Sequence, residues 1–152
     1  MRTALKIALF EGDVAVNPEL FENGDFSDGT VNGWGNTLRN PTIVNDNFRL
    51  KLTATASGSG YGGKGFEVES GKTYNLLIDC VETTDPNFQI LIGTTLTTLA
   101  DVYNSNGLGN TSQTLDAEFT ATLTGTYYLQ CRAGGNTGVY TIYDNISIKE
   151  VL

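Results

Sequence analysis

Alternation of apolar and polar residues is the strongest structural signal in this chain. Side chains along a β-strand point alternately to the two faces of a sheet, so a period of two predicts a half-buried strand. The period is clear in residues 48–55, where every second residue is apolar. It recurs in residues 63–70, 73–82, 88–92, 115–121, 127–131 and 139–151.

Turn residues separate these alternating segments. Gly71-Lys72, Asp85-Pro86-Asn87 and Thr124-Gly125 each lie between two of them. Short strands joined by turns at this spacing predict an all-β fold, an antiparallel two-sheet jelly-roll β-sandwich. We expect one core that contains ten of the apolar side chains, namely Phe48, Leu50, Leu52, Tyr74, Leu76, Ile78, Phe119, Leu129, Ile146 and Ile148.

The two ends of the chain carry its most specific motifs. Near the N-terminus it reads Leu20-Phe21-Glu22-Asn23-Gly24-Asp25-Phe26-Ser27-Asp28-Gly29, with Gly33-Trp34 shortly after. Near the C-terminus it reads Tyr140-Thr141-Ile142-Tyr143-Asp144-Asn145-Ile146-Ser147-Ile148-Lys149. These ends resemble those of jelly-roll carbohydrate-binding modules attached to xylanases and glucanases. They also resemble sandwich domains of tailed-phage virion proteins. The resemblance implies the same fold and places Trp34 in the core.

The 152 residues are expected to form one domain with a short extension. The jelly roll occupies residues 17–152, and residues 1–16 form an N-terminal arm or an added edge strand. Lys6 interrupts an apolar run that is already shorter than the core of a signal peptide. We therefore expect synthesis in the host cytoplasm without a signal peptide, followed by a location on the virion.

The arm contains Leu5, Ile7, Leu9 and Phe10. Exposed together they would form an apolar patch, which soluble monomers avoid and interfaces use. We predict that the arm binds a neighbouring subunit, which makes the protein a homo-oligomer. An added edge strand on the domain's own sheet is the alternative.

The composition disfavours several functions. The chain has no histidine, so it lacks the commonest general base and metal ligand, and we predict a protein that is not an enzyme. A net charge of −8 disfavours nucleic acid and anionic membrane as partners. Cys80 and Cys131 both lie in apolar strand patterns, which predicts two buried thiols and leaves a disulfide between them open.

Tyrosines are the candidates for contact with a ligand. Tyr128 points to the face opposite Tyr127 and shares that face with Gln130 and Arg132. An outward row of this kind offers flat apolar surface and hydrogen-bonding groups to a glycan or a protein, although it also fits an ordinary solvated sheet face. The other two candidates lie at or beside glycine-rich loops and are Tyr61 and Tyr103.

The family resemblance also implies a structural calcium ion, held by Glu22, Asp25 and Asp144. Calcium takes about six to eight oxygen ligands. Unless a bulge turns it outward, Asp144 would share a face with Ile142 and Ile146, where a carboxylate must be paired. The sequence indicates no other cofactor.

Two functions follow from these observations. The first is a non-enzymatic structural protein of a phage virion: a capsid decoration, head-fibre or tail-associated protein that contacts other virion proteins and further copies of itself. The alternative is a free-standing carbohydrate-binding module that binds glycans through exposed tyrosines. The two overlap, because a virion protein of this kind can contact glycans on the host surface.

Overall fold

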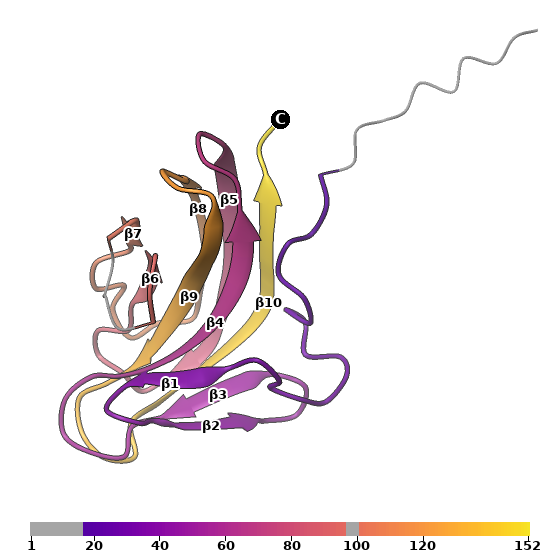
Figure 1. Cartoon of the computed structure of the whole chain (residues 1–152). Helices are drawn as coiled ribbons and strands as arrows, with labels where there is room; N and C mark the ends of the chain where they lie inside the picture. The colour runs from indigo at the N-terminus through magenta and orange to yellow at the C-terminus, as the bar shows by residue number, and fades with distance from the viewer. Residues whose placement is uncertain (1–16, 97–100) are drawn as a thin grey trace, which may run out of the picture.

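Two antiparallel β-sheets packed face to face form the domain (Figure 1). The computed structural model describes residues 17–96 and 101–152, and these ranges contain no helix. The strands are β1 (Gly35–Leu38), β2 (Thr42–Asn45), β3 (Leu50–Thr53), β4 (Gly60–Val68), β5 (Thr73–Thr83), β6 (Ile90–Gly93), β7 (Tyr103–Asn104), β8 (Gln113–Thr120), β9 (Gly125–Ala133) and β10 (Tyr140–Glu150).

The strand order is that of a jelly roll. One five-stranded sheet has the order β1-β4-β9-β6-β7, and the other has the order β2-β3-β10-β5-β8. Strands that are neighbours in a sheet are mostly distant in sequence, and each of the pairs is antiparallel. The predicted all-β jelly-roll sandwich is confirmed.

The core lies between the two sheets and contains nine of the ten predicted side chains, each of them buried. Phe48 is the exception, because 57% of it is exposed, and its prediction was wrong. Phe48 lies in a tight turn with φ near +61°, where its N–H donates to Asn45 Oδ1. This left-handed backbone breaks the alternation two residues before the start of β3 and turns the ring to solvent.

A β-bulge in β10 also changes which residues reach the core. Asp144 pairs with Asp79 of β5 but Ser147 pairs with Leu77, so β10 has one residue more than its partner, and Asn145 has φ near +50°. The expected common face of Ile142 and Ile146 was therefore wrong. Tyr143, in place of Ile142, points into the core on the same face as Ile146 and Ile148.

The residues that precede β1 close one side of the sandwich, beside β10 (Figure 1). Leu20 donates its N–H to the carbonyl of Ile148, and Ile146 donates to the carbonyl of Gly24. Phe21 is buried and makes an edge contact with Trp34 at 6.0 Å between ring centroids. Trp34 packs against the core while remaining partly exposed.

Both cysteines are free thiols buried in the core. The prediction of two buried thiols is confirmed. Cys80 comes from β5 and Cys131 from β9, so they belong to opposite sheets. Burial raises the pKa of the Cys80 thiol to about 12, so this side chain stays protonated and unreactive at neutral pH.

Gly24 provides a sharp test of the contact between the N-terminal segment and β10. A Cβ at this position would lie 1.8 Å from the carbonyl oxygen of Ile146. We expect Gly24→Ala to lower the free energy of unfolding by about 1–3 kcal/mol, because either the segment or β10 must shift. Urea unfolding measures the effect.

Gly35→Ala is the matched control, since a Cβ there meets nothing within 4 Å. Its unfolding midpoint should stay close to that of the wild type. Equal midpoints for the two variants would contradict the close packing of Gly24 on β10.

Candidate functional site

The outer face of the β4–β9 pair holds most of the predicted contact residues. Phe66, Val68, Tyr127 and Leu129 point into the core, so the residues between them point outward. In the paired register, Tyr61 is opposite Arg132, Gly63 opposite Gln130 and Gly65 opposite Tyr128. The outward direction of the Tyr128, Gln130 and Arg132 row is therefore as predicted.

A loop covers the middle of this row. Gln130 is fully buried although it points away from the core, and its Nε2 donates to the carbonyl of Thr95 at 3.3 Å. Leu96 of the same loop lies over Gly63, where an added Cβ would be 3.0 Å from the Leu96 Cδ2. The expectation that Gln130 is presented to solvent was wrong, because residues 94–96 fold back over the sheet.

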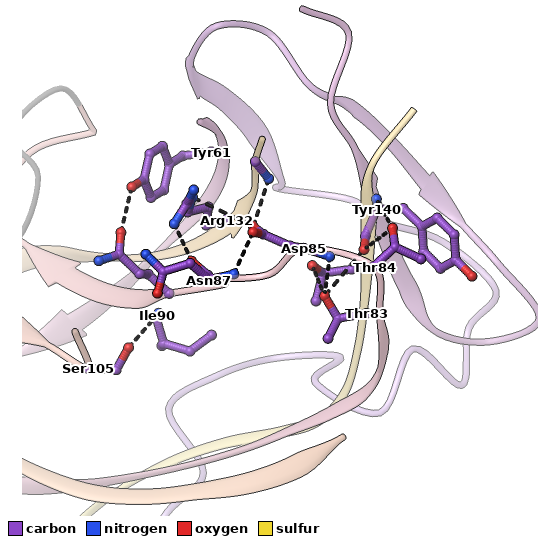
Figure 2. A network of polar contacts seen from close by, with 12 residues as sticks. Tyr61, Thr83, Thr84, Asp85, Asn87, Ile90, Ser105, Arg132 and Tyr140 are labelled. Atoms are coloured by element: carbon purple, nitrogen blue, oxygen red, sulfur yellow. Dashed lines mark hydrogen bonds and ion pairs between the residues drawn. The ribbon is translucent and has the colours of Figure 1, made fainter. Parts of the chain in front are cut away.

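Tyr61 is also buried, and it lies within β4 rather than at a flexible loop. Its hydroxyl donates to Gln89 Oε1 at 2.9 Å (Figure 2). Burial raises the pKa of its phenol. Tyr61 therefore acts as a fixed internal side chain and presents little surface to a ligand.

Arg132 forms a largely buried ion pair with Asp85 (Figure 2). The Arg132 Nε lies 3.6 Å from Asp85 Oδ2, with 11% of the Arg132 side chain exposed and none of the Asp85 side chain. Asp85 also accepts the N–H groups of Asn87 at 2.9 Å and of Gly134 at 2.8 Å. We predicted that Arg132 contacts a ligand on the outer face. Arg132 instead pairs with Asp85, which also binds Gly134, and so helps to join the loop after β5 to the loop after β9.

The same network reaches both sheets. Arg132 Nη1 donates to the carbonyl of Asn87, and the Thr83 hydroxyl accepts the N–H of Asp85 at 3.0 Å. The Thr84 hydroxyl accepts the N–H of Tyr140 at the start of β10. Figure 2 shows these contacts in one cluster, which fixes the loops at this end of the sandwich.

Tyr103 lies in the two-residue strand β7 and packs half-buried against the core. Burial raises the pKa of its phenol. The arm residues Leu5, Ile7, Leu9 and Phe10 lie outside the described residues.

Tyr128 is half-buried, as Tyr103 is, and it lies on the outer face of the β4–β9 pair. It lies beside Gly65, where an added Cβ would be 3.2 Å from Tyr128 Cε1 and 2.9 Å from Thr126 Cγ2. The Tyr128 ring and the Thr126 methyl therefore occupy the space over Gly65, and the absence of a side chain at Gly65 lets the ring lie close to the sheet.

Gly65 and Thr126 also line a groove of about 330 Å³ beside the Tyr128 ring, here named the β4 groove. Thr126 donates its hydroxyl to Glu67 Oε1 at 2.6 Å, and Lys64 Nζ donates to the carbonyl of Glu22 at 2.7 Å. Burial lowers the pKa of Lys64, whose ammonium lies 5.1 Å from the centre of the Phe21 ring. The groove is lined by Leu20, Glu22, Lys64, Gly65, Phe66, Glu67 and Thr126.

The acidic residues proposed for calcium do not gather. Asp144 is turned outward by the bulge and accepts the N–H of Asn145, while Asp25 accepts the N–H of Ser27. Across residues 17–96 and 101–152, no three carboxylate or thiol side chains lie close enough to hold a metal ion, so Glu22 does not complete a cluster with them. Calcium binding itself stays a prediction, tested by whether calcium raises and a chelator lowers the melting temperature.

Comparison with known proteins gives the fold and no sequence family. No family model and no curated protein matches the chain. A structure described as a CBM4 aligns with a TM-score of 0.63 and 14% identity over 85% of this chain and 98% of its own. The module TmCBM61, in complex with β-1,4-galactotriose, aligns with a TM-score of 0.61 and 11% identity over 88% of this chain and 99% of its own.

A third similar structure is the enzymatically active domain of tailspike protein 4 from bacteriophage CBA120. It aligns with a TM-score of 0.64 and 15% identity over 88% of this chain, which spans 21% of that structure. Identities this low show the fold alone. The resemblance to jelly-roll carbohydrate-binding modules and to phage sandwich domains is thus confirmed as a likeness of fold. In the part of the chain that the structure describes, no helix is long and apolar enough to span a membrane.

The buried ion pair makes a measurable prediction. Arg132→Ala leaves the Asp85 carboxylate buried without its positive partner, and we expect the free energy of unfolding to fall by about 3 kcal/mol. Lys51→Ala is the control, because Lys51 pairs with Asp46 at 3.8 Å in a partly exposed position, where such a pair contributes less than about 1 kcal/mol. Similar losses in the two variants, measured by urea unfolding, would refute the structural role of Arg132.

Proposed function

We propose that the protein is a non-enzymatic glycan-binding module that uses Tyr128 and the adjoining β4 groove. The observation that carries the proposal is the half-buried Tyr128 ring on the outer face, which lies over Gly65 next to the β4 groove that Gly65 and Thr126 line. A sugar ring needs an apolar platform for its C–H face and nearby polar groups for its hydroxyls. The ring and the groove offer both within one short surface.

The polar groups around the ring favour a neutral glycan. The Glu22 and Glu67 side chains are exposed at the groove, and the chain as a whole carries a net charge of −8. Carboxylates accept hydrogen bonds from sugar hydroxyls but repel sulfated or uronic acid-rich chains. The fold neighbours agree with this choice, since one was solved with β-1,4-galactotriose.

A glycosidase is disfavoured by the same two carboxylates. The general acid of a glycosidase needs an apolar setting that raises its pKa, and hydrolysis needs a pair of carboxyl groups that flank the scissile bond. Glu22 and Glu67 are both exposed, and Glu67 accepts a hydrogen bond from Thr126. We therefore propose binding without hydrolysis.

A location on a phage virion is the second part of the proposal. Its support is the tailspike protein, which contains a domain of the same fold. On a tail or head fibre, a glycan-binding sandwich would contact the host surface, with other virion proteins and further copies of the chain as partners. Antibody labelling of purified particles tests the location, and particles that carry no label would argue against it.

Replacement of the tyrosine tests the binding surface. We expect Tyr128→Ala to weaken binding of β-1,4-linked oligosaccharides by a factor of about two to ten, because stacking on one ring contributes about 0.5–1.5 kcal/mol. Isothermal titration calorimetry with β-1,4-galactotriose, followed by a glycan array for other sugars, measures the change.

Tyr140→Ala is the matched control. Tyr140 is also half-buried but begins β10 in the opposite sheet, so its loss should leave glycan affinity unchanged. Equal glycan affinities for Tyr128→Ala and the wild type, with unchanged melting curves, would show that the glycan binds at another surface. No binding to any glycan on the array would overturn the proposed function.

A further inference from the structure

One edge of β4 lacks a strand partner over half its length. β9 pairs with β4 from Gly60 to Val68, whereas β1 pairs with it at Tyr61, Gly62 and Gly63. Within the described residues, positions 64–68 therefore have a sheet neighbour on one side. Free edges of this kind are the usual places where another chain segment attaches.

The segment that follows the arm runs along this free edge without pairing to it. Pro18 and Leu20 lie across a hollow from Val68, and Glu22 lies beside Lys64, so the segment runs antiparallel to β4. Its backbone pairs instead with β10, through the N–H of Leu20 and the carbonyl of Ile148. A space therefore remains between the segment and the last residues of β4.

This space, here named the end hollow, has a volume of about 460 Å³. Its apolar lining comes from Pro18, Leu20, Val68 and Tyr74, and its charged lining from Glu67, Glu69, Glu150 and Lys72. Lys72 pairs with Glu69 at 3.0 Å and with Glu150 at 2.9 Å. Three carboxylates against one ammonium leave the end hollow with a net negative charge.

We propose that the end hollow binds the N-terminal arm of a second copy of this chain. The first ten residues carry two charges, both positive, at Arg2 and Lys6, although the whole chain is acidic. Between and beside these charges are Leu5, Ile7 and Leu9, whose period of two suits an added strand. The first ten residues of the arm thus match the end hollow in both charge and apolar character, whereas the acidic Glu11 and Asp13 lie between them and the domain.

The position of the arm favours exchange between copies. Residues 1–16 join the domain at Asn17-Pro18, directly beside the end hollow. A residue that precedes proline favours extended over helical backbone, which here applies to Asn17. Sixteen extended residues span about 50 Å, which is ample to reach the same hollow on a neighbour. The proposal does not rest on glycan binding.

A cysteine pair in the full-length protein tests the exchange. Ile7→Cys is combined with Thr124→Cys, since Thr124 is exposed on the rim of the end hollow. After mild oxidation we expect a disulfide-linked dimer or larger species on a non-reducing gel, while the buried Cys80 and Cys131 stay unreacted. The control pairs Ile7→Cys with Asn136→Cys, because Asn136 is exposed in the loop at the opposite end of the sandwich.

Each alternative outcome is decisive. An intramolecular disulfide without a dimer would show that the arm folds onto its own domain and would overturn the exchange. The absence of any cross-link, or equal cross-linking of the control pair, would also overturn it. A second readout uses light scattering on Ile7→Asp, which should melt like the wild type but shift the self-association constant at least tenfold towards the monomer.

Discussion

The contact between the N-terminal segment and the bulged part of β10 determines much of the structure. The bulge at Asp144 and Asn145 turns the carbonyl of Ile146 against Gly24, where no side chain fits. The N–H of Ile146 in turn binds the carbonyl of Gly24 at 2.9 Å. The two motifs that stand out in the sequence, one at each end, are therefore the two halves of one contact.

This contact also explains how the sandwich is closed. β3 covers the first residues of β10, and the N-terminal segment takes over from Glu19 onwards. The Glu19 carboxylate accepts the N–H of Ile148 at 2.7 Å and the hydroxyl of Ser147, so it satisfies backbone that would otherwise face the edge. Phe21 and Phe26 can then pack into the core without exposing the ends of the strands.

The period of two predicted the sheets and nearly all of the tested core, because it reports directly which face of a strand is buried. It failed at Phe48, and it failed in placing Ile142 and Ile146 on one face. Residues with positive φ account for both failures, because Phe48 itself has positive φ and Asn145, between Ile142 and Ile146, lies in the bulge that shifts the alternation by one residue. Nothing in the apolar pattern distinguishes such a residue from its neighbours. An asparagine beside each break, at Asn47 and Asn145, was the available local signal, since asparagine tolerates this backbone better than most residues.

The candidate site was predicted less well, because its exposure depends on contacts between distant parts of the chain. The outward direction of Tyr128, Gln130 and Arg132 follows from their own strand. The burial of Gln130 depends on Thr95, and the pairing of Arg132 depends on Asp85. Gly65 becomes informative once the register places it opposite Tyr128, which a single sequence does not reveal.

The covering loop has a consequence for the proposed function. Because residues 94–96 lie over Gly63 and Gln130, the open part of the β4–β9 face is reduced to the surface around Tyr128 and the β4 groove. One aromatic ring and a short groove can hold a short stretch of a glycan, and such a contact is weak by itself. Linked copies of a weak site raise the overall affinity by effective concentration, without any new contact. Self-association through the arm would thus supply the strength that a single domain of this shape lacks.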